Sequence, residues 1–241
     1  MQACERTFVP HQAIDPALAL AQHAAYCRLL ADCGAEVVTL DVNASLPDCT
    51  FIEDTTIVLD EVAVLGSMGA TSRRAEPAAI EPVLCKHREV LRIDLPATLE
   101  GGDVLRVGRT LLVGESGRTN AAGVAALATI ARRHDYAISR VAVRGCLHFK
   151  TACTALPDGR LLVNPAWIGT AALAGFELVP VPEDEPWGAN VALVGDKVLL
   201  SAAHIQTAQL IEKLRFTLRP IEISEFAKAE GGVTCLSLLI A

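Results

Sequence analysis

The chain has 241 residues, of which 51% are apolar and 4% are aromatic, and its formal net charge is −7. A chain of this length can bury a large core, here built mainly of Ala, Val, Leu and Ile, which excludes a disordered protein. The Lys and Arg residues form no long run, which argues against a nucleic-acid partner because phosphate binding needs a clustered basic face.

The sequence predicts neither export nor membrane insertion. Residues 1–15 lack the apolar segment of a signal peptide, and the chain has no run of about 18 apolar residues. The 8 cysteines form no C-x-x-C pair, which argues against a zinc ribbon or a thioredoxin motif. In a long, core-rich chain without an export signal, free thiols are expected, so we expect a cytoplasmic protein.

A helix and a strand are the first predicted elements. Residues 15–34 have the composition of a helix, with Asp15 as its N-cap, Pro16 in the first turn and Gly34 after its end. The apolar and β-branched residues at 35–42 predict a strand.

One pattern then recurs along the chain. Two apolar runs joined by a turn occupy 51–65, 101–113, 148–163 and 188–200, and 231–240 opens in the same way, with a last strand near 235. The turns are Asp60-Glu61, Gly108-Arg109, Pro157-Asp158-Gly159 and Gly195-Asp196. Helical stretches at 72–84, 118–134 and 203–214 follow, and each leads into a further strand. A strand–turn–strand–helix–strand unit repeating every 40–50 residues or so predicts an α/β chain whose repeats close around a centre, as one domain over residues 1–241.

Strongly polar residues stand at the openings of these units, where the hydrophobic pattern expects apolar ones. They are Glu53 with Asp54, Glu100 with Asp103, His148, and Cys235. If the repeats close around one axis, these side chains converge on a central pocket. Local rules tend to fail at functional sites, so this departure indicates a site.

Cys235 and His148 are candidates for nucleophilic chemistry. A lone Cys in a strand is most often a buried structural residue, but Gly231 and Gly232 precede Cys235, and glycine in a strand often marks the close approach of a ligand. A lone His is likewise most often structural, yet together the two fit a thiolate–imidazole pair. Glu100 is either a solvated turn residue or the carboxylate that orients His148.

Charged residues that would suit a cationic amino acid form a second group. Strand alternation would place Glu53 and Asp54 on opposite faces, so that at least one faces inward and needs a partner. A ligand guanidinium is one natural partner, and one of the chain's own arginines is another. Arg73 and Arg118 are either solvated or form a clamp for a carboxylate. Asp48 is either a turn residue or the partner of an amino group.

Seven blocks of this sequence resemble the dimethylarginine dimethylaminohydrolases. They are FIEDTTIVL, SRRAE, LEGGDVL, GESGRTNAAG, LHFKTACTAL, EPWGANV and EGGVTCLSLLI, and they follow the family's order. The family belongs to the guanidino-group modifying (pentein) superfamily. The resemblance therefore implies a five-bladed α/β propeller of ββαβ units, in agreement with the repeat.

The resemblance also implies roles for the candidate residues. Cys235 would be the nucleophile, His148 the general acid/base and Glu100 its orienting carboxylate. Asp54, with Glu53, would bind the guanidinium, and Arg73 and Arg118 would bind the α-carboxylate. Asp48, the backbone near Phe51 and the Ala229 carbonyl would bind the rest of the amino acid.

The implied reaction is hydrolysis of an N-omega-methylated arginine to citrulline and a methylated amine through a covalent thiouronium. No metal or organic cofactor is needed for it, and a zinc ion bound by Cys235 and His148 would inhibit it. Two segments depart from the family's pattern. Residues 65–69 read LGSMG where many relatives have an Arg-Pro-Gly turn, and the region before the first helix, which carries the loop expected to close over substrate, is short.

Several alternatives stay open from the sequence. The nearest is a deiminase or related hydrolase acting on arginine or another guanidino compound, and an amidinotransferase is a further one. A non-catalytic binding module of the same fold is a different class, although the joint presence of Cys, His and Glu argues against it. The sequence lacks the signature of a papain-type protease around its cysteine, which argues against that class. An exposed sheet edge would support a homodimer, for which the sequence supplies no residue-level argument.

Overall fold

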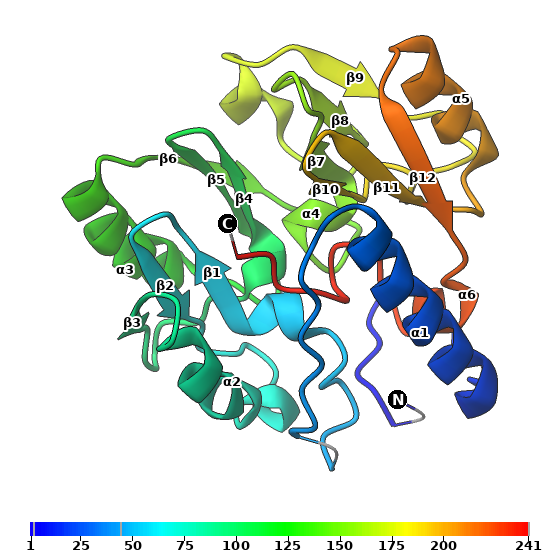
Figure 1. Cartoon of the computed structure of the whole chain (residues 1–241). Coiled ribbons are helices and arrows are strands. Elements are labelled where there is room, and N and C mark those ends of the chain that lie inside the picture. Colours follow the sequence, from blue (N-terminus) through cyan, green and yellow to red (C-terminus); the bar gives the residue numbers. More distant parts are fainter. Residues whose placement is uncertain (2, 44, 241) are drawn as a thin grey trace.

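A three-stranded sheet is the recurring unit of the computed structural model, which describes residues 1, 3–43 and 45–240 (Figure 1). Four such sheets occur within these residues. In each, the middle strand pairs with the first strand antiparallel and with the third parallel. An antiparallel pair can be joined by a tight turn, whereas a parallel pair needs a crossover. The predicted strand–turn–strand order, followed by a crossover and a third strand, is therefore confirmed.

The strands follow one another in chain order. The first sheet consists of β1 (Thr56–Val58), β2 (Val62–Leu65) and β3 (Glu89–Arg92). The second consists of β4 (Val104–Val107), β5 (Thr110–Glu115) and β6 (Ala137–Ala142). The third consists of β7 (Cys153–Ala155), β8 (Leu161–Val163) and β9 (Leu178–Pro180). The fourth consists of β10 (Val191–Val194), β11 (Lys197–Ser201) and β12 (Thr217–Ile221).

α-Helices provide the crossover in three of these units. They are α2 (Glu76–Leu84), α3 (Ala121–Ala131) and α5 (Ile205–Lys213). The third unit crosses over through the 3₁₀ turn η5 (Thr170–Leu173) instead. Helix α1 (Pro16–Asp32) precedes all four sheets, and the Asp15 side chain caps it by accepting hydrogen bonds from the N–H groups of Ala17 and Leu18. The predicted N-cap is thus confirmed.

Glycine allows the tight hairpins at the predicted turn positions. Gly108 and Gly195 have φ values of 57° and 60°, in the left-handed region that a side chain disfavours. The ladders of β4–β5 and β10–β11 therefore continue up to the residues that flank each turn.

Two predicted strands are wrong. Residues 35–42 and 231–240 carry no strand, although their apolar side chains are used. Val37 and Leu236 pack in the cluster around Tyr26 of α1, and Leu40 and Leu238 pack against α2 and β2. These segments pack together with α1 against the fourth and first units, and their apolar pattern reflects this packing rather than a hydrogen-bonded sheet. Figure 1 shows the C-terminal segment, in red, running from the region of α1 towards the first two sheets.

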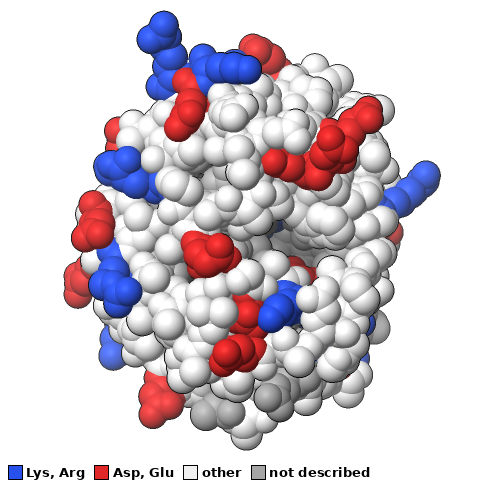
Figure 2. Space-filling view, turned by 90° about the vertical axis from the view of Figure 1, so that its right-hand side faces the viewer, with Lys and Arg blue, Asp and Glu red and all other residues white. Residues whose placement is uncertain are grey.

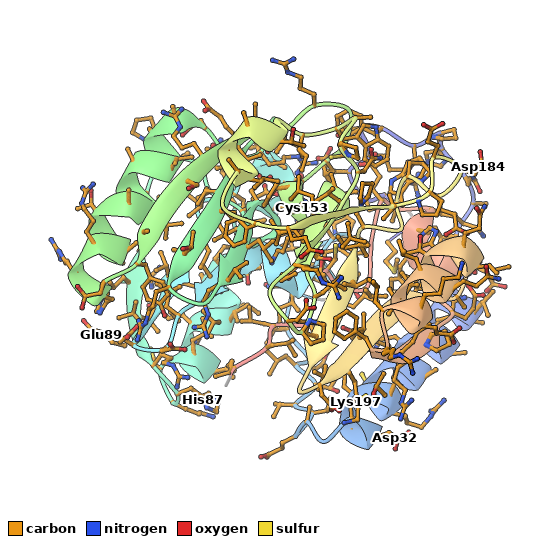
Figure 3. The ribbon with its side chains drawn as sticks, turned by 90° about the horizontal axis from the view of Figure 1, so that it is seen from above. Asp32, His87, Glu89, Cys153, Asp184 and Lys197 are labelled. Carbon is orange, nitrogen blue, oxygen red and sulfur yellow. The ribbon has the colours of Figure 1, made fainter. Side chains whose placement is uncertain are left out.

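Shared apolar clusters join each unit to the next. One cluster contains Leu59 of the first unit and Leu111 of the second, and another contains Leu112 and Leu161. A third joins the third and fourth units, and a fourth joins the fourth unit to α1. Seen from above, Cys153 lies in the interior, where the units meet (Figure 3). All eight cysteines are free, as predicted.

Within the described residues, no helix has the length and apolar character needed to cross a bilayer.

Candidate active site

Short helical turns deliver the polar residues at the start of three units. The 3₁₀ turn η1 (Ile52–Thr55) precedes β1 and carries Glu53 and Asp54. Glu100 precedes the 3₁₀ turn η3 (Gly101–Asp103), and His148 precedes the short helix α4 (Phe149–Ala152). The expectation that strand alternation separates Glu53 from Asp54 is wrong because the pair lies in a helical turn. Both side chains are largely buried, with exposed fractions of 13% for Glu53 and 3% for Asp54.

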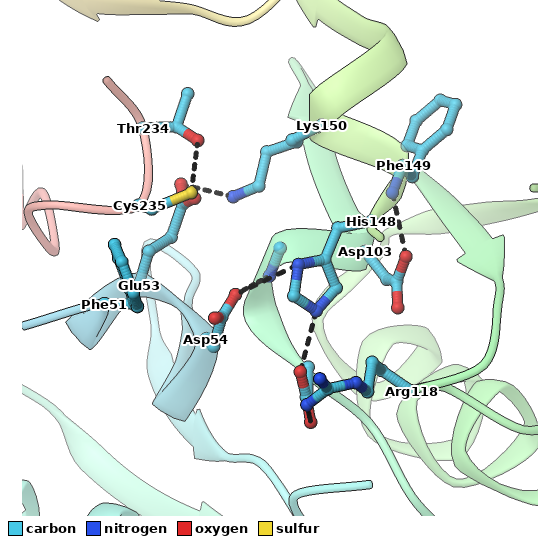
Figure 4. A network of polar contacts seen from close by, with 12 residues as sticks. Phe51, Glu53, Asp54, Asp103, Arg118, His148, Phe149, Lys150, Thr234 and Cys235 are labelled. Atoms are coloured by element: carbon cyan, nitrogen blue, oxygen red, sulfur yellow. Dashed lines mark hydrogen bonds and ion pairs between the residues drawn. The ribbon is translucent and has the colours of Figure 1, made fainter. Parts of the chain in front are cut away.

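A small cavity brings most of the predicted residues together. Those that line it are Asp48, Phe51, Asp54, Arg73, Arg118, His148, Ala229 and Cys235. Glu100 contacts His148, and Glu53 lies beside Cys235 (Figure 4). The cavity measures about 10 Å³, which is room for no more than one water molecule. The site is therefore assembled but closed.

Buried acidic groups surround His148. Its Nε2 lies 2.7 Å from Oε2 of Glu100, and its Nδ1 lies 3.7 Å from Oδ1 of Asp54. Burial alone lowers the pKa of His148, but the charge of Asp54 and the hydrogen bond with Glu100 outweigh it and raise the pKa to about 9. At neutral pH the ring is thus an imidazolium that can donate a proton. A Cβ on Gly102 would lie 2.7 Å from Cγ of His148, so glycine is required beside the ring.

Backbone amides fix the carboxylates around this ring. Oε1 of Glu100 accepts a hydrogen bond of 2.9 Å from the N–H of Gly69, which lies in the segment that departs from the family's pattern. Oδ1 of Asp103 accepts one of 2.8 Å from the N–H of Phe149, the residue that follows His148. Oδ2 of Asp103 accepts one from the Ser116 hydroxyl at 2.7 Å. The second unit therefore holds both the backbone beside His148 and the imidazole ring of His148.

Arg73 is bound by two carboxylates of the protein itself. Its Nη1 lies 2.6 Å from Oδ2 of Asp54, its Nε and Nη2 donate to Glu76, and Nη2 also donates to the Phe51 carbonyl. Burial raises the pKa of Asp54, but the charges of His148 and Arg73 outweigh it and lower the pKa overall. The sequence left two partners open for Asp54, a ligand guanidinium or one of the chain's own arginines. In the structure Asp54 pairs with the chain's own Arg73.

Cys235 lies in a turn rather than in a strand. Its Sγ accepts a hydrogen bond of 3.4 Å from the N–H of Gly232 and lies 3.9 Å from the Thr234 hydroxyl (Figure 4). Burial of the thiol, together with the charges of Asp54 and Glu53, raises the pKa of Cys235 to about 12. The group is therefore a thiol at neutral pH.

Besides two nitrogens of Arg6, two buried charged atoms beside this cavity, of opposite sign, lack a hydrogen-bond partner among the described residues. Oε1 of Glu53 pairs with Lys150, but within the described part of the chain Oε2 of Glu53 has no hydrogen-bond partner. Nη1 of Arg118 also has none there, and it lies 3.7 Å from Oε1 of Glu100. Burial raises the pKa of Glu53 in spite of Lys150. Because buried polar groups are normally satisfied, these two atoms indicate where a ligand with a cation and an anion would bind.

Residues 5–9, which we call the N-terminal strap, are fastened over the cavity. The N–H of Glu5 donates to the Asp48 carboxylate, and the N–H groups of Thr7, Phe8 and Val9 donate to the carboxylate of Glu230. Glu230 has φ of 63°, a costly value for this residue, and such strain is typical of functional segments.

A larger cavity of about 210 Å³ lies on the other side of residues 230–233. Trp187, Asn190, His204 and Ile223 are among the residues that line it. Figure 2 shows the molecule hollowed on the face that carries α5 and α6, with acidic side chains near the rim.

The spacing of Asp54, Glu100 and His148 would also suit a metal ion, since one ligand atom from each lies within 4.8 Å of the others. These groups are already engaged, however: Asp54 pairs with Arg73, and His148 hydrogen bonds to Glu100. A metal ion would have to displace a cation already present.

Several residues that shape the site escaped the sequence interpretation. Glu76 stands three positions after Arg73, the spacing of an ion pair on a helical turn, so the block SRRAE contained a usable signal. Lys150 follows His148 by two positions and could have been matched to Glu53 by charge. The contacts of Gly69, Glu230 and Asn190 run to distant segments, and no local pattern reveals them.

Comparison with known proteins adds the family. A family model described as "Arginine deiminase" matches residues 42–174. The chain is 39% identical over 234 residues to the N(G),N(G)-dimethylarginine dimethylaminohydrolase of Streptomyces coelicolor, covering 96% of this chain and 90% of that protein. It is 34% identical over 226 residues to the protein of the same name from Pseudomonas aeruginosa, covering 93% and 89%.

The fold agrees with this match. A crystal structure of a dimethylarginine dimethylaminohydrolase variant, in an adduct with S-methyl-L-thiocitrulline, superposes with a TM-score of 0.89 at 32% identity, over 92% of this chain and 89% of that chain. The repeated mixed sheets are thus the α/β propeller units that the sequence predicts. By its sequence over nearly its whole length and by its fold, the chain belongs to the dimethylarginine dimethylaminohydrolase family.

Proposed function

We propose that this protein hydrolyses N-omega-methylated arginine to citrulline and a methylated amine. The observation that carries the proposal is the pair of unsatisfied buried groups, Oε2 of Glu53 and Nη1 of Arg118, in a site that also contains Cys235, His148 and Glu100. A guanidino amino acid has one cation and one carboxylate to satisfy them. Membership of the family supports the methylated substrate.

The binding mode follows from these charges. The guanidinium lies between Glu53 and Asp54 and beside Cys235, and the α-carboxylate binds Nη1 of Arg118. Arg73 donates a further hydrogen bond to the α-carboxylate through the Nη1 hydrogen that does not bind Asp54. The Asp48 carboxylate and the Ala229 carbonyl receive the α-ammonium, with the backbone near Phe51 completing the pocket. Because the resting cavity is far smaller than an arginine, the N-terminal strap has to move away from Asp48 for substrate to enter.

The reaction begins when the bound guanidinium lowers the pKa of the Cys235 thiol, whose proton leaves to water. The thiolate attacks the guanidinium carbon and forms a C–S bond. The His148 imidazolium then donates its proton to the methylated nitrogen as the C–N bond breaks, leaving a covalent thiouronium. Neutral His148 next accepts a proton from water as the water oxygen attacks the same carbon. The C–S bond then breaks and the departing Cys235 sulfur takes the hydroxyl proton of the adduct, which gives citrulline and restores the thiol. Glu100 stabilises the charged ring throughout.

An arginine deiminase activity is the second candidate, because the same groups would bind unmethylated arginine and release ammonia. It differs only in the space around the leaving nitrogen. The match of residues 42–174 to the family model described as "Arginine deiminase" favours this candidate.

The test is release of citrulline and amine from asymmetric dimethylarginine, monomethylarginine and arginine by wild type, Cys235→Ser and Cys85→Ser. Cys85 is an exposed cysteine outside the cavity and serves as the matched control. The proposal expects release of dimethylamine from asymmetric dimethylarginine and of methylamine from monomethylarginine. Both activities should be lost in Cys235→Ser and retained in Cys85→Ser. Ammonia release from arginine alone would select the deiminase, and activity that survives in Cys235→Ser would refute both.

A further inference from the structure

Hydrogen bonds from the side chain of Asn190 join the two segments that carry Cys235 and His148. Its Nδ2 donates to the Lys150 carbonyl at 2.9 Å and to the Thr234 hydroxyl at 3.0 Å. Its Oδ1 accepts from the N–H of Thr234 at 3.2 Å. Lys150 lies two residues after His148, and Thr234 immediately precedes Cys235. One amide group therefore links the acid/base segment to the nucleophile segment.

The orientation of this amide is set by its partners. The Lys150 carbonyl can only accept and the Thr234 N–H can only donate, so the oxygen and nitrogen of Asn190 cannot be exchanged without losing both bonds. The backbone beside Asn190 is itself fixed, because the Thr154 hydroxyl donates to the Ala189 carbonyl at 2.6 Å and accepts from the N–H of Val191 at 3.2 Å. Asn190 is thus a rigid reference point at the start of β10.

Packing alone leaves the nucleophile segment less constrained on one side. Asn190, Gly231, Gly232 and Val233 line the cavity of about 210 Å³, so close-packed side chains do not confine these residues there. A Cβ on Gly232 would lie 2.2 Å from Oδ1 of Asn190, which shows how closely the amide approaches this segment. Hydrogen bonds therefore constrain this side of the segment, whereas packing of Val233 and Leu236 in the cluster around Tyr26 constrains the other.

We propose that Asn190 is a positioning residue that fixes the Cys235 thiol relative to the His148 imidazole, a role that rests on the proposed reaction of these two residues. The attack on the guanidinium and the protonation of the leaving amine need both groups in register with one carbon atom. Small displacements at this stage lower the rate steeply, by as much as about 100-fold for 1 Å.

A matched comparison tests the proposal. Asn164 is an equally buried asparagine whose side-chain amide donates to the Pro186 carbonyl and accepts from the N–H of Ala166. Its backbone N–H donates to the Ala152 carbonyl of α4, and an alanine substitution leaves that hydrogen bond in place. Asn190→Ala is expected to lower kcat by about 100-fold and to leave KM within roughly threefold, because substrate contacts are unchanged. Asn164→Ala is expected to lose comparable thermal stability while retaining kcat.

An isosteric variant separates positioning from packing. In Asn190→Asp, a carboxylate can still accept from Thr234 but repels the Lys150 carbonyl, so kcat falls as in Asn190→Ala. Protonation of that carboxyl restores a donor, and the kcat ratio of Asn190→Asp to wild type is expected to rise as the pH falls. Wild-type kcat in Asn190→Ala, an equal loss in Asn164→Ala, or a ratio independent of pH would each overturn the proposal.

A measurement without substrate keeps this proposal separate from the proposed function. The rate at which iodoacetamide alkylates Cys235 is followed by peptide mass spectrometry across a range of pH, with exposed Cys85 as the internal reference. Because burial and the charges of Asp54 and Glu53 raise the pKa of Cys235, loosening its segment is expected to move the alkylation profile to lower pH in Asn190→Ala and not in Asn164→Ala. An unmoved profile would refute the positioning role, whereas failure of the wild type to turn over any guanidino compound would refute only the proposed function.

Discussion

Arg73 lies between two buried carboxylates, and its Nη1 atom is 2.6 Å from Oδ2 of Asp54. Glu76 binds the other edge of the same guanidinium. Removing one member of a buried ionic group is costly because the remaining charges stay buried without a partner, whereas the intact group adds little stability by itself. Arg73 is therefore expected to act on stability as well as on substrate binding.

Substitution of Arg73 by Gln should lower the free energy of unfolding by roughly 3–5 kcal/mol, because Asp54 and Glu76 lose their common cation. Chemical denaturation of wild type and variant measures this. Arg118→Gln is the comparison variant and should lose less stability, because the ion pair of Arg118 with Glu100 is long, at 3.7 Å, and includes no hydrogen bond from Nη1 among the described residues. Equal losses in the two variants would contradict the distinction.

The same Arg118→Gln variant should bind substrate weakly. If Nη1 of Arg118 receives the α-carboxylate, losing this charge-assisted contact should raise KM by roughly tenfold to a hundredfold, which corresponds to about 1.5–3 kcal/mol. Steady-state kinetics provide the measurement, and N-omega-methylated agmatine, which keeps the methylated guanidinium but lacks the carboxylate, is the control substrate. An unchanged KM would move the carboxylate site elsewhere.

Glu230→Gln should loosen the N-terminal strap. The three N–H groups of residues 7–9 now donate to a charged carboxylate, and hydrogen bonds to a charged acceptor are the stronger kind. Amide exchange at these residues should accelerate by roughly tenfold, with amides of β11 as the internal reference. Exchange at the wild-type rate would mean that Glu230 does not fasten the strap.

The raised pKa of His148 should make stability depend on pH. The folded protein holds this proton up to a pKa of about 9, against 6.5 for the unfolded chain. The native state therefore binds more protons between these values, and its extra stability is complete below pH 6.5 and is lost as the pH rises through 9. The loss is on the order of 3 kcal/mol. Unfolding free energies measured across this range should fall in wild type and fall less in His148→Gln.

Local rules predicted the repeating unit well. Gly108 and Gly195 adopt the left-handed conformation that a tight hairpin needs, and Asp15 caps α1, because each of these features depends on a few neighbouring residues. Residues 35–42 failed as a strand because a strand is defined by its partner, and an alternating pattern also suits an extended segment packed between two cores.

The sequence predicted which residues form the site but not which of them contact one another. The sequence singled out Asp54, Glu100, His148 and Cys235 as polar residues at the openings of the units, and the arrangement of the units around a centre brings them together. Which carboxylate pairs with Arg73, and which amide links Lys150 to Thr234, depends on contacts between distant segments. A sequence without an alignment contains no direct record of such contacts.

The ring of units also dictates when the site comes into existence. Asp54, Glu100 and His148 each stand at the start of a different unit and Cys235 lies in the C-terminal segment, so no single folded unit contains both Cys235 and His148. Trp167 and Trp187, by contrast, meet edge to face at 5.1 Å between neighbouring units. During refolding, tryptophan fluorescence should therefore recover before catalysis does, and the delay between the two signals would time the closure of the ring.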